Sequence, residues 1–342
     1  MLTDPSRAAT ERDDGPNLLE VQDLRTYFAT DERVLRAVDG VSLSVAAGEI
    51  MAIVGESGSG KTVTGMSIMR LLNPRTARFE GGSVQLRTRQ GKVVDLLSLP
   101  EKEMRRIRGS EVSMIFQDPL TSLNPVFSIG DQIIEGILQH SEVSKADARL
   151  QAADLLSQVG LGEGKRLLMQ YPHQLSGGMR QRVMIAIALS SNPQVLIADE
   201  PTTALDVTVQ AQIVELLKRL ARERGMGVIF VTHDLALVAK MADKVCVMYA
   251  GEVVEQGVAM EVFLRPQHPY TVALVGCIPH GPSEDRLTPI PGHAPDPLKG
   301  LVGCRFAERC QHALPKCVQG PIQLRAIEDR RAVRCVRVEE LS

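Results

Sequence analysis

The feature that most constrains the fold is one run near the start of the chain, Gly55-Glu56-Ser57-Gly58-Ser59-Gly60-Lys61-Thr62, which fits the pattern G-x-x-x-x-G-K-[ST]. It follows a short apolar run over residues 50–54 and opens a stretch with helical spacing over residues 62–72. In such a turn, backbone N–H groups point at the α- and β-phosphates, Lys61 reaches the β- and γ-phosphates, and the Thr62 hydroxyl ligates Mg²⁺. The sequence therefore predicts an α/β fold whose nucleotide-binding loop contains Gly55, Ser57, Gly58, Ser59, Gly60, Lys61 and Thr62.

A second apolar run, residues 195–198, ends in two acids, Asp199 and Glu200. This layout is typical of a strand that carries a Mg²⁺-binding carboxylate beside a phosphate loop, and Asp199 is the candidate. Glu200 projects differently and is the candidate general base for a water that attacks the γ-phosphate. The alternative is a solvated acidic pair that opens a turn before Pro201. The phosphate loop elsewhere in the chain favours the nucleotide interpretation.

A third motif, Leu175-Ser176-Gly177-Gly178-Met179, resembles the signature motif of ATP-binding cassette (ABC) ATPases. Alone, this turn is an equally good helix cap. Here it stands in order with three further elements that are similar to the Q-loop, the D-loop and the switch histidine of the family, namely Gln117, Ala204-Leu205-Asp206 and His233. The resemblance implies a RecA-like parallel sheet with an antiparallel β subdomain and a helical subdomain.

The resemblance also implies residue roles. Gln117 would sense the γ-phosphate and ligate Mg²⁺, while His233 would hold the γ-phosphate and position the attacking water relative to Glu200. An aromatic residue at the end of the first strand, Phe28 or its neighbour Tyr27, would stack on the adenine. The motif residues Ser176, Gly177, Gly178 and Asp206 would bind nucleotide. Ser176 and Gly178 would do so in the opposite subunit, which makes a second cassette necessary.

Composition excludes several other classes of function. With 39 Lys plus Arg against 41 Asp plus Glu, a net charge of −2, no Trp and 3% aromatic residues, the chain lacks the basic, aromatic surface of nucleic-acid-binding proteins. Its longest apolar stretches, such as residues 183–189, fall well short of a membrane span. The polar, acidic start does not match a secretory signal. We therefore expect no nucleic-acid partner, and contact with a membrane only through other chains.

Changes in the apolar pattern and in proline content divide the chain into three parts. Residues 1–16 read as a flexible N-terminal tail and residues 17–265 as the ATPase domain, with a helical subdomain over about 118–185. After Arg265, prolines become too dense for helices or central strands. Residues 266–342 are therefore predicted to form a small Pro- and Cys-rich C-terminal domain.

Two regions are similar to the ATPases of oligopeptide and dipeptide importers. One is residues 118–125, directly after Gln117; the other is the C-terminal stretch with His268-Pro269-Tyr270-Thr271, Pro291-Gly292-His293 and Gly303-Cys304-Arg305-Phe306. The resemblance implies a peripheral subunit at the cytoplasmic face of the membrane that drives import of di- or oligopeptides. Its partners would be a second related ATPase, two transmembrane permease subunits and an extracytoplasmic solute-binding protein. Import of nickel, glutathione or another small solute is the alternative, and a soluble ABC ATPase outside transport is a distant one.

Four of the six cysteines, Cys304, Cys310, Cys317 and Cys335, lie in the last 39 residues. Four soft thiolates with no regularly spaced histidine favour a [4Fe-4S] cluster. Zinc is the main alternative, although structural zinc sites usually have two short C-x(2–4)-C pairs, and free or disulfide-bonded cysteines are another. The similar cysteines of dipeptide-importer ATPases favour iron and sulfur. Cys246 and Cys277 are expected to be packing residues.

Overall fold

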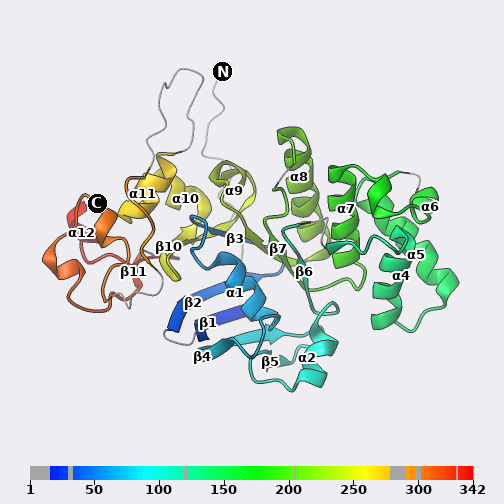
Figure 1. The fold of residues 1–342 in the computed structure, drawn as a ribbon, viewed down its shortest axis with the longest axis horizontal. Coiled ribbons are helices and arrows are strands. Elements are labelled where there is room, and N and C mark those ends of the chain that lie inside the picture. Colours follow the sequence, from blue (N-terminus) through cyan, green and yellow to red (C-terminus); the bar gives the residue numbers. More distant parts are fainter. Residues whose placement is uncertain are drawn as a thin grey trace.

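The computed structural model describes residues 16–29, 34–118, 122–162, 164–203, 205–277, 290–296, 302–328 and 330–341. Within these ranges the strands form an eight-stranded sheet in the order β11-β12-β10-β9-β3-β8-β7-β6 and a four-stranded sheet in the order β2-β1-β4-β5. In Figure 1 the larger sheet crosses the middle of the molecule, with the smaller sheet beneath it. The predicted tail falls almost entirely on residues 1–15, which lie outside the described ranges.

Parallel pairing joins the strands that carry the site. β3 (Ile50–Val54) lies between β8 (Gly227–Val231) and β9 (Lys244–Tyr249), and β7 (Val195–Asp199) lies between β8 and β6 (Val112–Ile115). Every residue of β3, β6, β7 and β8 is buried. Strands covered on both faces need continuous apolar runs, which is the pattern the sequence shows there.

The smaller sheet is antiparallel and packs on the same core. It consists of β1 (Asn17–Ala29), β2 (Val34–Ala46), β4 (Ala77–Arg87) and β5 (Val93–Asp95). Buried residues of β1 and β2 share one apolar cluster with residues of β3, β7 and β8. Beside this sheet lies α2 (Glu101–Ile107). The α/β architecture with an antiparallel β subdomain is thus confirmed.

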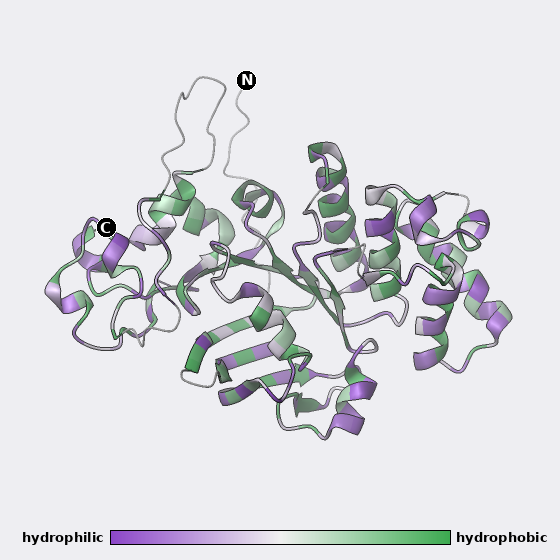
Figure 2. Cartoon of the chain, viewed as in Figure 1, coloured by the Kyte–Doolittle hydropathy of each residue, from purple (hydrophilic) through white to green (hydrophobic). Residues whose placement is uncertain are grey.

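Helices gather at the end of the larger sheet formed by β6 and β7 (Figure 1). Figure 2 shows mixed polar and apolar colouring on these helices, whereas the central strands are mostly apolar. Among the described residues, three α-helices lie within the predicted helical subdomain, about residues 118–185, and a fourth begins in it. They and the helices that follow are α4 (Ile129–His140), α5 (Lys145–Gln158), α6 (Gly164–Leu167), α7 (Gly177–Ala188), α8 (Val207–Arg224) and α9 (Leu235–Met241).

The helix after the phosphate loop is shorter than its pattern suggests. The apolar spacing predicts a helix over residues 62–72, but α1 runs over Lys61–Ile68. Met69 caps it, and Arg70 has a φ of 50°, in the left-handed region that a helix does not continue through. The prediction was therefore too long: Met69 is buried beyond the last helical residue, whereas Leu71 is exposed.

The C-terminal region is attached to the larger sheet. It contains α10 (Ala259–Leu264), α11 (Pro269–Val275), β11 (Arg325–Glu328), β12 (Arg331–Val333) and α12 (Val338–Leu341), and β12 pairs with β10 (Glu252–Val258). A buried ion pair, 2.8 Å between Arg331 Nη2 and Glu255 Oε1, fixes this junction. Within the part of the chain that the structure describes, no helix is both long enough and apolar enough to span a bilayer.

Candidate functional site

The phosphate loop connects β3 to α1 in a conformation that only glycine accepts at two positions. Gly55 has φ +151°, and a Cβ there would lie 2.1 Å from the Met248 carbonyl oxygen. Gly60 has φ +99°, and a Cβ there would lie 2.3 Å from the Ala37 carbonyl oxygen. The backbone is therefore packed so closely that larger residues are excluded at both ends of the turn.

Polar groups of the loop are arranged around this backbone. Lys61 Nζ donates to the carbonyl oxygens of Gly55 and Glu56, each at 2.9 Å. Burial lowers the pKa of Lys61. The negative charges of Glu200 and, to a smaller extent, Asp199 oppose this shift. Ser59 Oγ is buried and has no hydrogen-bond partner among the described residues. An unpaired buried hydroxyl beside a lysine fits a site that receives an anionic oxygen.

The end of β7 brings the first acid to the loop. The Thr62 hydroxyl donates to Asp199 Oδ1 at 3.1 Å, so the two expected Mg²⁺ ligands are neighbours although 137 residues separate them. Burial raises the pKa of Asp199, and the Thr62 hydrogen bond opposes this rise. Two hard oxygen ligands at the edge of a phosphate loop fit the ligand preference of Mg²⁺.

The second acid gathers the other expected catalytic residues. Glu200 has φ 45°, an uncommon left-handed conformation for a non-glycine residue, at the junction between β7 and the turn that follows. Its carboxylate accepts hydrogen bonds from Gln117 Nε2 at 3.0 Å and from the Thr203 hydroxyl at 2.9 Å, and it lies 3.2 Å from His233 Nδ1. Burial tends to raise the pKa of Glu200, but Thr203 and His233 outweigh it, so the pKa lies below its usual value. The carboxylate is therefore held in its proton-accepting form.

A cavity of about 580 Å³ is lined by some of these groups together with residues of the first strands, whereas Asp199 and His233 are not among the described residues that line it. The phosphate loop, Gln117 and Glu200 line it, and so does Phe28. Tyr27 is not among the described residues that line it, and its hydroxyl donates to Asp39 at 2.7 Å instead. A volume of this size suits a small ligand.

The signature residues stand apart from this cavity. Ser176 caps the N-terminus of α7, where its hydroxyl accepts a hydrogen bond from the Met179 N–H at 3.3 Å. Asp206 caps α8 in the same way, accepting from the Val209 N–H at 2.9 Å. Of the described residues that line the 580 Å³ cavity, none belongs to the run 176–178. Ala204 of the expected D-loop lies outside the described residues.

One set of neighbours was not predicted from the sequence. Ala294, Pro295 and Asp296, far along the chain, line the same cavity as the phosphate loop. Arg309 pairs with Glu56 of the loop at 2.8 Å. Pro291-Gly292-His293 marked this region in the sequence only as a family feature, and no local pattern shows a contact across 253 residues.

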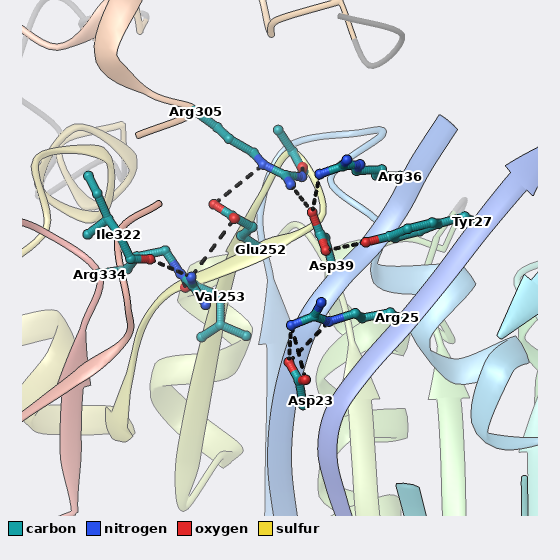
Figure 3. Close-up of polar contacts among 11 residues, drawn as sticks. Asp23, Arg25, Tyr27, Arg36, Asp39, Glu252, Val253, Arg305, Ile322 and Arg334 are labelled. Carbon is teal, nitrogen blue, oxygen red and sulfur yellow. Dashed lines mark hydrogen bonds and ion pairs between the residues drawn. The ribbon is translucent and has the colours of Figure 1, made fainter. Parts of the chain in front are cut away.

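Figure 3 shows a second connection between the C-terminal region and the first strands. Arg305 forms an ion pair with Asp39 of β2 and lies 3.4 Å from Glu252 of β10. Asp39 also accepts the hydrogen bond from Tyr27 on β1. Burial tends to raise the pKa of Asp39, but the hydrogen bond from Tyr27 and the positive charge of Arg305 together lower it below its usual value. The network joins the C-terminal region to the β subdomain beside the cavity.

A second, much smaller cavity is lined by all four clustered cysteines, and its volume is about 10 Å³. The sulfurs accept backbone N–H groups: Leu314 donates to Cys317 at 3.5 Å and Arg337 to Cys335 at 3.4 Å. The backbone of Phe306 bonds to Cys304, and that of His312 to Cys310. Burial raises the pKa of Cys304 to about 12.

The four cysteines lie in turns and short 3-10 segments. Across the described residues, no group of three or more His, Cys, Asp or Glu side chains is placed to hold a metal ion. Cys246, in β9, is fully buried, as expected for a packing residue.

Family models match both parts of the chain. Residues 38–203 match the ABC transporter family, and residues 254–317 match the oligopeptide/dipeptide transporter C-terminal region. The chain is 48% identical over 324 residues to the oligopeptide transport ATP-binding protein AppD of Bacillus subtilis, covering 94% of this chain and 97% of AppD. It is 49% identical over 301 residues to the dipeptide transport ATP-binding protein DppD of the same organism, with 88% of each chain covered.

Solved structures agree with this assignment. The dimeric ATP-binding cassette MJ0796, bound to ADP and Pi in a post-hydrolysis state, has a TM-score of 0.62 and 29% identity, covering 70% of this chain and 98% of the cassette. The fold and the site define an ATP-hydrolysing cassette. More narrowly, the chain belongs to the ABC transporter family, in the branch that carries the oligopeptide/dipeptide transporter C-terminal region.

Proposed function

We propose that this chain hydrolyses ATP to drive import of di- or oligopeptides through a membrane ABC transporter. The observation that carries the proposal is the C-terminal match over residues 254–317, joined to a complete set of nucleotide motifs. Relatives named for oligopeptide and dipeptide transport align over nearly the whole chain. The same machinery importing nickel, glutathione or another small solute is the alternative, and a non-transport ABC ATPase is the distant one.

The proposed partners are two transmembrane permease subunits, a second and homologous ABC ATPase, and an extracytoplasmic solute-binding protein. We place the chain peripherally at the cytoplasmic face of the membrane, with no nucleic-acid partner. The chain on either side of Gln117 supports a permease contact, because Phe116, Val126 and Phe127 expose 41%, 73% and 52% of their surface. Exposed apolar side chains close in sequence to Gln117 are suited to contact another chain.

The proposed chemistry follows from the geometry of the large cavity. The phosphate loop and Lys61 bind the phosphates, while Thr62, Asp199 and Gln117 hold the metal; Mg²⁺ supplies charge neutralisation on the phosphate oxygens. Glu200 accepts the proton of the attacking water, and His233 positions that water. Phe28, which lines the cavity where Tyr27 does not, is the better candidate for stacking on the adenine.

The signature residues complete the proposed site from the other cassette. The N-terminus of α7, formed by Ser176, Gly177 and Gly178, is available to a partner. Asp206 lies at the N-terminus of the next helix, α8. A helix N-terminus carries unpaired N–H groups that favour phosphate oxygens. Their separation from the chain's own cavity supports a role in the partner's ATP site.

For domain organisation we propose an ATPase domain over residues 17–265 with a helical subdomain over 118–185, and a C-terminal domain over 266–342. The α4 to α7 helices support the subdomain, and the change to short helices, 3-10 turns and short strands after Leu264 supports the boundary. Pairing of β12 with β10 means that the C-terminal domain shares the main sheet instead of folding apart from it.

We also propose that Cys304, Cys310, Cys317 and Cys335 hold a [4Fe-4S] cluster, with zinc as the alternative. Two observations support ligand chemistry: the four residues line one cavity, and each sulfur accepts a backbone N–H, which opposes the rise in thiol pKa that burial causes at Cys304, Cys310 and Cys335.

The cluster is tested on protein purified without oxygen. We expect brown protein that contains iron and acid-labile sulfide, both of which are lost in Cys310→Ser and Cys335→Ser. Cys277→Ser, a cysteine outside the cavity, is the matched control and should keep both. Colourless protein with stoichiometric zinc would establish the alternative instead.

The transport function is tested in vesicles that contain the assembled transporter. ATP-dependent uptake is measured for dipeptides, longer peptides, nickel and glutathione, each with its solute-binding protein present. Uptake of peptides alone supports the proposal. Uptake of nickel or glutathione without peptides would assign the alternative, and ATPase activity with no uptake of any solute would contradict a transport role.

A further inference from the structure

Part of the wall around the nucleotide cavity comes from the C-terminal region. Ala294, Pro295 and Asp296 line the 580 Å³ cavity together with Phe28 and the phosphate loop. The nucleotide role proposed above concerns the motif residues of the cassette, and the segment 290–296 has no part in it. The position of this segment beside the phosphate loop depends on side-chain contacts between the two.

Arg309 makes that connection. Its Nη1 and Nη2 donate to the two carboxylate oxygens of Glu56 in the phosphate loop, at 2.8 and 3.1 Å. Its Nε donates to the Pro291 carbonyl oxygen at 2.8 Å, and Nη2 also reaches the Ile290 carbonyl at 3.3 Å. A further hydrogen bond goes to the Tyr249 hydroxyl at 3.1 Å. Only 6% of the Arg309 side chain is exposed.

The guanidinium is suited to this task because its planar fork fixes two partners at once, and hydrogen bonds between charged groups are the strong ones. Glu56 is also held at its main chain, where its N–H donates to the Tyr270 hydroxyl at 2.9 Å. The carbonyl of Glu56 in turn accepts from Lys61 Nζ. Glu56 of the phosphate loop is thus held by two side chains of the C-terminal region, Arg309 and Tyr270.

We propose that Arg309 is a positioning residue of the nucleotide site, which fixes the segment 290–296 as a wall of the cavity and holds the phosphate loop through Glu56. The proposal rests on the proposed nucleotide role of that cavity. It assigns to the C-terminal region a direct part in ATP affinity. It also means that bound nucleotide is covered on one side by residues outside the cassette.

The first test uses Arg309→Gln in the full chain and in the assembled transporter. We expect Kd and KM for ATP to rise about tenfold, the effect of losing charged hydrogen bonds, while kcat stays within about twofold. Glu56→Gln breaks the ion pair but keeps the Arg309 bonds to the Pro291 and Ile290 carbonyls, so it should give a smaller rise. The double variant should be no worse than Arg309→Gln, because that single variant already breaks the pair.

Arg108→Gln is the matched control. Arg108 also donates to both oxygens of one carboxylate, Glu101, and to two main-chain carbonyls, those of Met69 and Arg70, yet it does not line the cavity. It should leave KM for ATP unchanged. An equal rise in KM for Arg108→Gln, or no rise for Arg309→Gln, overturns the proposal.

The second test is amide hydrogen exchange of the wild-type chain. Backbone amides in residues 290–296 should exchange more slowly when Mg-ATP is added, and this protection should be lost in Arg309→Gln. Unchanged exchange in the wild type, under conditions where ATP binding is measured, overturns the proposed wall. Failure of the wild type to bind ATP at all would instead contradict the proposed function.

Discussion

The nucleotide cavity and the four-cysteine cavity are built on opposite principles. The first measures about 580 Å³, and its lining includes polar residues that follow the parallel strands β3, β6 and β7 of one sheet. The second measures about 10 Å³, and its cysteines come from turns. Regular strands fix where their end residues lie, so chemistry at a sheet edge is in place before a ligand arrives. Turns fix the position of a side chain only through its contacts, so the arrangement of the cysteines relies on packing.

The largest effect should come from removing the proposed base in the nucleotide cavity. In Glu200→Gln we expect ATP turnover of the assembled transporter to fall about a thousandfold, because general-base catalysis is lost. Affinity for ATP should stay within about twofold, since Lys61 and Asp199 are untouched. Both are measured by steady-state hydrolysis and by nucleotide binding.

Glu215→Gln on the exposed face of α8 is the control for this charge change and should behave as wild type. If Glu200→Gln hydrolysed ATP at a near wild-type rate, the cavity would be arranged for binding without the proposed chemistry. The contrast between a preassembled reaction site and a packed C-terminal region would then fail.

The next effect tests whether the nucleotide cavity is complete within one chain. A Cβ at Gly178 would lie 2.9 Å from Val209 Cγ1, which strains the chain's own packing, whereas a Cβ at Gly177 has its nearest neighbour, Leu205 Cδ2, at 3.8 Å. Gly177→Trp is therefore the cleaner variant. We expect the ATPase rate of the assembled transporter to fall about a hundredfold, with ATP affinity of the isolated chain unchanged.

Gly162→Trp, at an exposed position of the helical region where a Cβ meets nothing within 4 Å, should leave both quantities unchanged. A large loss of ATP affinity in isolated Gly177→Trp would place the signature motif in its own chain's site. The nucleotide cavity would then be as self-contained as the cysteine cavity.

The same contrast explains what the sequence could predict. Buried parallel strands need continuous apolar runs, so β3, β7 and β8 and the residues at their ends were predictable, and Asp199 and Thr62 do meet. The end of α1 was not, because Arg70 leaves the helix although the apolar pattern continues. The contact of Arg309 with Glu56 depends on a fold across 253 residues, which no local spacing reveals.

A third effect measures how much the C-terminal region depends on buried packing. His268 is fully buried, and its Nδ1 accepts the Tyr270 N–H at 3.0 Å. Burial, helped by the charge of Arg334, lowers its pKa to about 3. In the unfolded chain its pKa is near 6.5, so the unfolded state binds the extra proton as pH falls. This contribution to stability is complete above pH 6.5 and is lost progressively below it.

Between pH 6.5 and pH 5 we expect His268 to account for a loss of about 2 kcal/mol in unfolding free energy, measured by urea denaturation. His268→Asn keeps a helix-capping side chain and should lack this part of the pH dependence. His173→Asn, at an exposed position, should retain it. An equal pH slope in wild type and His268→Asn would show that the region does not depend on a neutral buried imidazole.

The smallest effect concerns the two aromatic residues at the end of β1, which alternate between the faces of the strand. Phe28 lines the nucleotide cavity, while the Tyr27 hydroxyl is bound to Asp39. Phe28→Leu should weaken ATP binding about fivefold, roughly 1 kcal/mol, because a stacking ring is lost while apolar bulk is kept. Tyr27→Leu is the matched change and should leave Kd for ATP within about twofold.

Stacking accepts any base, so Phe28→Leu should weaken GTP binding by the same factor. A loss for Tyr27→Leu alone would reverse the assignment, and it would mean that the Asp39 and Arg305 network, not the cavity lining, holds the base.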